Sequence, residues 1–189
     1  MRLYKKFSFG LSPSEYVSVD ELNHFLSLYS KYIRSAYSSP PYPDKSYHTR
    51  KILSEGFSRE GEVKKFRDKL KLIKKHKLEF KLALNSNSEL EDPVGEVKKF
   101  TDTMGIAPDR IVCKKKYAHA LHSSFPEIRL TYSYTNALCG PKDIEEIPRI
   151  FDTVVVGNRW LRDVKFMKLL SDKGFKVEHL LNNGCLWTC

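Results

Sequence analysis

The stretch 153-TVVVGNRWLRDVKFMKLLSDKGFKVEHLLN-182 decides the fold. It begins with a short run of β-branched residues, continues through a helical pattern over 161–174, and closes with a second strand-like run over 176–182. Gly174 stands where a helix can end on a left-handed residue. A strand, a helix and a strand in succession predict two parallel strands joined by a crossover helix.

The same unit recurs along the rest of the chain. Strand-like runs occupy the ranges 3–9, 32–38, 80–85, 110–114, 127–133, 153–157 and 176–182. Helical patterns cover the ranges 18–32, 58–77, 94–105, 116–125, 142–148 and 161–174. This alternation predicts an α/β fold with parallel strands and with helices outside them.

Two architectures fit the alternation. One is an incomplete or compact (β/α) TIM-type barrel of about seven parallel strands, and the alternative is an open, doubly wound parallel sheet. A complete barrel usually takes about 250 residues, whereas this chain has 189. A barrel would therefore lack its eighth strand. The length also predicts a single barrel-like domain over 1–189.

The chain carries an excess of positive charge. Its 33 lysine and arginine residues outnumber 23 acidic residues, which gives a net charge of +10. Such an excess favours polyanionic partners such as nucleic acid or a ribonucleoprotein. The alternative interpretation is a lysine-rich, solvated surface without a polyanionic partner.

The amino-terminal sequence, MRLYKKFSFGLSPS, lacks the apolar core of a signal peptide, and no apolar run is long enough to span a bilayer. We therefore expect a cytoplasmic protein that has no membrane partner. The four cysteines of such a chain are expected to be reduced or metal-bound rather than disulfide-bonded.

The positions of the cysteines suggest a metal site. Cys113 and Cys139 each follow or end a strand-like run, and Cys185 and Cys189 form a C-x-x-x-C after the last one. In a barrel the carboxyl ends of the strands share one rim, so these thiols could converge there. Thiolates are the natural ligands of an iron–sulfur cluster or of zinc. The alternative for Cys113 is a small buried hydrophobe.

Amides and one guanidinium are expected on the same rim. They are Asn85, Asn136, Asn158, Arg159, Asn182 and Asn183. These groups suit the binding of a base edge or a phosphate, although asparagines also cap turns at strand ends. The long connection 38–57 adds Tyr42 and Arg50 among prolines and lysines. Aromatic side chains between cations can stack on bases and contact phosphates, and a rigid loop without a ligand is the alternative.

Several common catalytic signatures do not occur in the sequence. It contains no P-loop, no G-x-G-x-x-G, no H-E-x-x-H and no G-x-S-x-G. Nucleotide hydrolysis, dinucleotide-dependent redox chemistry, zincin-type proteolysis and serine hydrolysis therefore have no support from motifs.

The stretch 134–170, YTNALCGPKDIEEIPRIFDTVVVGNRWLRDVKFMKLL, resembles a segment of the collagenase-like peptidase family. In that family a strand ends in an Arg-Glu-Leu-like turn that opens the next helix. Arg159 matches the arginine of that turn, while Trp160 stands where glutamate is usual. The segment 176–189, KVEHLLNNGCLWTC, is similar to a strand that ends in a cysteine-containing turn, with Cys185 as the matching cysteine.

The resemblance implies a TIM-type barrel. The family includes proteases, as well as proteins that hold an iron–sulfur cluster on cysteines and support the hydroxylation of RNA or quinones. This chain would be a truncated relative, linked to an iron–sulfur cluster and acting on RNA or another polyanion, with Cys185 and Cys189 as ligands and Arg159 as the substrate anchor. The alternative is a non-catalytic basic protein that binds nucleic acid or a ribonucleoprotein.

An incomplete barrel also predicts a homodimer. Seven strands leave two edges with unpaired backbone groups. Lys5 and Lys6 discourage pairing at the first edge, whereas the last edge carries the apolar Leu180 and Leu181. We expect a second chain to cover this carboxyl-terminal edge with Trp187 as the anchor. The alternative is a monomer whose own tail covers the edge.

Overall fold

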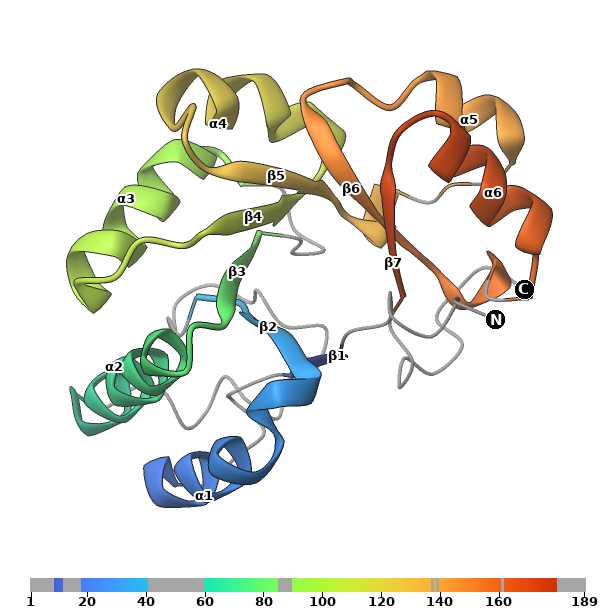
Figure 1. The fold of residues 1–189 in the computed structure, drawn as a ribbon. Coiled ribbons are helices and arrows are strands. Elements are labelled where there is room, and N and C mark those ends of the chain that lie inside the picture. Colours follow the sequence, from blue (N-terminus) through green and yellow to red (C-terminus); the bar gives the residue numbers. More distant parts are fainter. Residues whose placement is uncertain are drawn as a thin grey trace. The chain divides into compact units, whose positions relative to one another are not determined.

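The structure is a computed structural model that describes residues 9–11, 18–40, 60–84, 90–136, 138, 140–160 and 162–179. Seven strands within these residues follow the order of the chain, β1-β2-β3-β4-β5-β6-β7 (Figure 1). The pairs β1–β2, β2–β3, β5–β6 and β6–β7 are parallel. A doubly wound sheet needs a reversal of strand order, and this sheet has none. The fold is therefore α/β, with seven parallel strands in the order of an incomplete (β/α) barrel.

The strands are β1 (Phe9–Leu11), β2 (Ile33–Ser38), β3 (Glu79–Leu84), β4 (Arg110–Cys113), β5 (Arg129–Tyr132), β6 (Phe151–Val156) and β7 (Lys176–His179). The α-helices are α1 (Val19–Tyr29), α2 (Glu60–Lys75), α3 (Pro93–Met104), α4 (Ala118–Ser124), α5 (Pro141–Glu145) and α6 (Val164–Asp172). The six predicted helices and the last six predicted strands are confirmed with shifts of a few residues at their ends, whereas the predicted first strand, 3–9, shares only Phe9 with β1. Most of the run 3–9 and all of 180–182 lie outside the described residues.

The chain divides into two compact units, Met1–Arg110 and Ile111–Cys189. We call them unit 1 and unit 2 and describe each by itself. The expectation of one domain over 1–189 stays a prediction.

Helices α1 and α2 lie side by side in unit 1 (Figure 1). Helix α1 begins at Ser18, whose side-chain oxygen accepts a hydrogen bond of 3.0 Å from the backbone N–H of Glu21. This is the N-cap arrangement that the Ser18–Glu21 spacing predicts. The buried side chains of the two helices recur at helical spacing: Leu22, Leu26, Phe66, Leu70 and Ile73. Burial of these stripes holds both helices in unit 1.

Strand β3 has two different faces. Phe80, on one face, is fully buried and stacks on Phe100 of α3 with ring centroids 5.7 Å apart. Glu79 and Lys81 alternate with Phe80 and therefore point to the opposite face. The register places Ala36 of β2 beside Phe80, so a small residue leaves room for the large ring. The apolar core of unit 1 thus lies between the sheet and its helices.

Unit 2 repeats the arrangement. Helix α6 begins at Asp163, whose carboxylate accepts a hydrogen bond of 2.9 Å from the backbone N–H of Phe166. Phe166 and Leu170 are buried, as are Val154 and Val156 of β6. Apolar residues on one side of α6 explain why the strand–helix–strand pattern of 153–182 is recognisable in the sequence.

Among the described helices, none is long and apolar enough to cross a membrane. Strand β7 is the last in the order, and it pairs with β6 from Lys176 to His179. Leu180, Leu181 and Trp187 lie outside the described residues. The homodimer through this edge therefore stays a prediction.

Asp109 ties the entrance of β4 to β3 within unit 1. Its carboxylate accepts hydrogen bonds from the backbone N–H of Phe80 at 2.6 Å and from Nζ of Lys74 at 2.5 Å. Its own backbone N–H donates to the carbonyl oxygen of Phe80 at 2.9 Å. Asp109 thus bonds both backbone polar groups of Phe80, as a residue of a paired strand would, and its carboxylate also contacts the end of α2.

We expect Asp109→Ala to lower the free energy of unfolding by about 1–3 kcal/mol, because the N–H of Phe80 loses its acceptor. Asp109→Asn is the matched control, since it keeps an acceptor oxygen but loses the charge next to Lys74. It should cost less than half as much, because a partly exposed ion pair is worth only about 0–1 kcal/mol. Urea unfolding measures both values. Equal losses for the two variants would show that the ion pair, and not the backbone bond, is the important contact.

Candidate functional site

The carboxyl ends of three strands in unit 2 share one local structure. Each is followed by a single turn of 3₁₀ helix: η5 (Lys115–Tyr117) after β4, η6 (Tyr134–Asn136) after β5, and η7 (Asn158–Trp160) after β6. The residues that follow these three strands are called the unit 2 rim below. Carboxyl ends of parallel strands are where α/β proteins usually build their sites.

Asn136 holds two of these turns together. Its side-chain oxygen accepts a hydrogen bond of 2.8 Å from the backbone N–H of Lys115, and its amide nitrogen donates to the carbonyl oxygen of Ser133 at 2.8 Å. The same nitrogen lies 3.5 Å from the carbonyl oxygen of Cys113. The amide is thus engaged in joining β4 to β5. This geometry is that of an asparagine that caps a turn, the alternative raised by the sequence.

Trp160 is built into the rim as a rigid support. Its indole stacks on Phe166 with ring centroids 3.9 Å apart and an interplanar angle of 13°. Its Nε1 donates a hydrogen bond of 2.8 Å to the carbonyl oxygen of Leu138. The half-buried indole therefore has partners for both its apolar face and its polar edge. The ring connects the turn after β6 to α6 and to the segment after β5.

Arg159 lies on this support and is exposed. Its guanidinium carbon is 5.2 Å from the centroid of the Trp160 ring, a cation–π distance. A glutamate at position 160 would place a carboxylate next to the guanidinium, whereas an indole stabilises the cation without neutralising it. Among the described residues, no carboxylate pairs with Arg159. A guanidinium carries N–H donors that can contact an anion.

More cations follow β4. Lys114, Lys115 and Lys116 are consecutive, and the last two are exposed. Lys115 pairs with Glu146 at 3.1 Å, but both side chains are largely in solvent, so the pair is weak. The unit 2 rim therefore carries positive charge at the ends of two strands, β4 and β6. The lysine run was not among the residues singled out from the sequence, although three adjacent lysines directly after a strand are a readable signal.

Cys113 is fully buried at the end of β4. Burial raises the pKa of its thiol to about 12, because a thiolate is costly to form away from water. A bound metal ion would itself favour the thiolate, so the role of cluster ligand stays a prediction for Cys113. It has the environment of a small buried hydrophobe.

The other proposed ligands and several proposed binding residues lie outside the described residues: Cys139, Cys185, Cys189, Asn85, Asn182, Asn183, Tyr42 and Arg50. For Asn158 the structure describes the backbone, which forms the first residue of η7. Within the part of the chain that is described, no group of three or more His, Cys, Asp and Glu side chains can hold a metal ion. The cluster prediction stays a prediction.

A second group of charges, which was not singled out from the sequence, lies on the sheet of unit 1. Glu79 contacts Arg110 at 3.3 Å and Lys81 at 3.7 Å, and the Arg110 side chain is 2% exposed. Glu79 and Arg110 are the first residues of β3 and β4, so they lie at the amino-terminal end of the strands. Charges at that end of a barrel usually serve stability. The pattern EFKLAL, with opposite charges two apart in a buried strand, is the signal that could have revealed them.

Tyr132, at the end of β5, is buried and packs edge-on against Phe151 with ring centroids 5.2 Å apart. Burial, together with the carboxylates of Asp143 and Glu146, raises the pKa of its hydroxyl to about 12. The phenol is therefore neutral at physiological pH. Because the unfolded chain loses this proton near pH 10, the folded state becomes less stable as the pH rises from about 10 to about 12.

No protein-family model and no curated protein matches the chain. Among solved structures, that of the U32 peptidase Mk0906 is similar, with a TM-score of 0.58. The two sequences are 12% identical, and the match covers 92% of this chain and 67% of that chain. Likeness at this level of identity establishes a shared fold. It agrees with the barrel that the resemblance to collagenase-like peptidases implied.

The burial of Cys113 predicts that its thiol resists alkylation. At pH 8 only about one thiol in ten thousand would be ionised for a pKa of about 12. We expect iodoacetamide to leave Cys113 unmodified in the folded protein and to modify it completely in urea. Peptide mass spectrometry separates it from the other three cysteines. Modification of Cys113 in folded protein, at the rate seen in urea, would contradict the assignment.

Proposed function

We propose that this chain is a distant relative of the collagenase-like peptidases that binds RNA or another polyanion at the unit 2 rim. Arg159 is the anchor. The observation that carries the proposal is the exposed guanidinium held over Trp160 at the carboxyl end of β6, without a described carboxylate beside it. Shared fold with the U32 peptidase Mk0906 supports the relationship.

The charge balance of the whole chain supports a polyanionic ligand. A net charge of +10 attracts phosphate-rich molecules over long range and accelerates their association. The rim adds short-range contacts, because a guanidinium can donate two parallel hydrogen bonds to one phosphate. A nucleic acid or a ribonucleoprotein offers such phosphates.

Binding is favoured over catalysis by the chemistry of the described rim residues. Proteolysis needs an activated nucleophile or a metal-bound water. Cys113 is buried with a raised pKa, and Tyr132 stays neutral at physiological pH. Asn136 and Trp160 use their polar groups in contacts that support the turns. Arg159 is the described rim residue best placed to meet a ligand.

The test compares Arg159→Ala, Arg159→Lys and the wild type for binding to single-stranded RNA at several salt concentrations. The alanine variant should weaken binding about tenfold, because one charge-assisted contact is lost. It should also lower the salt slope by about one, as for the loss of one phosphate contact. The lysine variant should keep the salt slope but lose part of the affinity, because an ammonium cannot bind a phosphate bidentately.

Arg162→Ala is the matched control. Arg162 is also exposed and lies three residues away, so its removal changes the net charge equally. No aromatic contact with Arg162 is described, and we expect a loss of less than threefold. Equal losses of RNA affinity in the Arg159 and Arg162 variants would show that the rim is only a nonspecific charged surface. RNA binding that is insensitive to salt would contradict the proposal as a whole.

An iron–sulfur cluster is a separate proposal that rests on the resemblance and on Cys185 and Cys189. When bound, such a cluster would supply electron-transfer chemistry. The further candidates are Cys139 and Cys113, and the burial of Cys113 favours Cys139 as the third ligand. No step of the proposed binding function depends on the cluster.

We expect protein purified without oxygen to contain iron and sulfide if the cluster proposal holds. A Cys185→Ser, Cys189→Ser double variant should then lose both, while Cys113→Ala should retain them, since its thiol is buried. RNA binding measured on the same samples separates the two proposals. A wild type that holds no iron after reconstitution would refute the cluster and leave the binding proposal intact.

A further inference from the structure

Unit 1 carries exposed aromatic side chains at and after the end of α1. Five large hydrophobic side chains are exposed in the described part of the chain, and four of them lie between positions 28 and 37. They are Leu28 at 51%, Tyr29 at 47%, Tyr32 at 58% and Tyr37 at 39% exposed. Exposed aromatic side chains grouped in this way mark a binding surface more often than an ordinary surface.

Tyr29 is the last residue of α1, and Tyr32 lies in the turn that continues it. Phe25 and Tyr29 are one α-helical turn apart, with ring centroids separated by 5.0 Å. Tyr32 follows Tyr29 by three residues at the end of η3 (Ser30–Tyr32), which directly continues α1. Residues three apart in a 3₁₀ turn lie above one another. Leu22 and Leu26 form the buried face of α1, and Phe25 is half-buried, whereas Tyr29 and Tyr32 are exposed.

A cation lies over the outermost ring. The Nζ atom of Lys31 is 4.9 Å from the centroid of Tyr32, and Lys31 is exposed. The acidic residues of α1, Asp20 and Glu21, occupy its first turn, at the opposite end of the helix. The end of α1 that carries the tyrosines therefore has a positive local charge.

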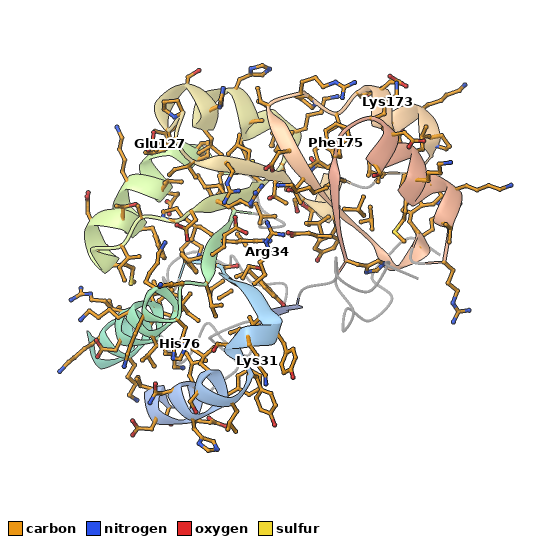
Figure 2. All side chains as sticks on the ribbon, viewed as in Figure 1. Lys31, Arg34, His76, Glu127, Lys173 and Phe175 are labelled. Carbon is orange, nitrogen blue, oxygen red and sulfur yellow. The ribbon has the colours of Figure 1, made fainter. Side chains whose placement is uncertain are left out.

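The neighbouring connection adds further cations. Strands β2 and β3 pair in parallel with Ser35 opposite Glu79. The segment that joins α1 to β2 therefore lies next to the segment that joins α2 to β3. Lys75 and Lys77, at the end of α2, are both exposed. Figure 2 shows Lys31 and His76 on the same side of unit 1, where α1 and α2 end.

Lys77 adopts a backbone conformation that usually belongs to glycine. Its φ is 58°, and it is the one described non-glycine residue with positive φ. The N–H of Leu78 donates to the carbonyl oxygen of Ile73 at 3.1 Å, and the N–H of Lys77 donates to that of Lys74 at 2.9 Å. These two bonds define the turn that normally carries a left-handed glycine after a helix.

Helix α6 ends with the same two hydrogen bonds, from Phe175 to Leu170 and from Gly174 to Ser171. There the left-handed residue is Gly174, with φ of 89°. Unit 1 thus has a lysine where the same chain uses glycine in an equivalent turn, despite the backbone strain that a side chain brings there. A strained backbone at an exposed lysine such as Lys77 motivates a functional hypothesis for its side chain.

We infer that Tyr29, Lys31, Tyr32, Lys75 and Lys77 form a binding surface for single-stranded nucleic acid, called the unit 1 surface here. The tyrosine rings stack on bases, and the lysines contact the flanking phosphates. Rings interleaved with cations fit a polyanion with flat bases better than an apolar protein helix, which would favour aliphatic side chains without charges. The surface is distinct from the unit 2 rim, and it can be tested without reference to Arg159.

The first experiment measures binding of a fluorescein-labelled, 12-nucleotide RNA without secondary structure, with inorganic polyphosphate as a competitor that lacks bases. Tyr29→Ala, Tyr32→Ala double substitution should weaken RNA binding at least tenfold, since each stacked base contributes measurably. Polyphosphate binding should change less than twofold. Leu28→Ala is the matched control, because Leu28 is similarly exposed but has no ring to stack.

The second experiment uses Lys77→Gly. We expect this variant to unfold at a higher urea concentration than the wild type, because glycine relieves the left-handed strain. The same variant should bind RNA more weakly and show a salt slope reduced by about one. A gain in stability together with a loss of RNA binding cannot arise from misfolding.

Three results would overturn the inference. In the first, the double tyrosine variant binds RNA as well as the wild type. In the second, it loses polyphosphate and RNA binding equally, which would show that the surface binds phosphates by charge and does not stack on bases. In the third, it changes the oligomeric state in sedimentation while RNA binding is unaltered, which would make the surface a protein contact. If Arg159→Ala loses RNA binding while the double tyrosine variant keeps it, the result supports the unit 2 rim and counts against the unit 1 surface.

Discussion

Parallel pairing between consecutive strands is the constraint on which the rest of this structure depends. A chain that leaves one strand at its carboxyl end must travel back the length of the sheet before the next strand can begin. Each helix makes that return, and each needs an apolar side toward the sheet and a polar side toward water. The two ends of the strands consequently differ in character. One end collects the turns after strands, such as η5, η6 and η7, and the other collects the turns after helices, such as the Lys77 turn.

Two arginines show how the same side chain serves opposite purposes in this fold. Arg110 begins a strand, is almost completely buried and contacts the carboxylate of Glu79, so its charge is compensated. Arg159 follows a strand, is exposed and lies over an indole, so its charge is supported without being cancelled. A buried guanidinium needs a carboxylate because desolvation is expensive. An exposed one is available for a ligand only when such a carboxylate is absent.

The order of strands and helices could be predicted because it depends on local periodicity. Ser18 at the start of α1 and Gly174 after α6 are also local signals, and each stands where the sequence placed it. The hydrogen-bond partners of Asn136 and Trp160 and the left-handed backbone of Lys77 could not be predicted, because each depends on a neighbour from another part of the chain or on backbone geometry. Asn136 meets Lys115 across 21 residues, and Trp160 meets Leu138 across 22. The burial of Cys113 was one of two alternatives, and its position in an apolar strand was the relevant signal.

The sequential strand order has a further consequence for the energetics of the chain. When each strand pairs only with the strand before it and the strand after it, stability is distributed as a series of nearest-neighbour contacts, as in repeat proteins. Among the described strands, opening of the sheet at β7 then breaks one interface, whereas opening at β3 breaks two. Amide hydrogens should accordingly exchange through small openings that begin at the edges, and protection should increase toward the interior strands. A fold of this kind can lose order at an edge while its interior stays intact.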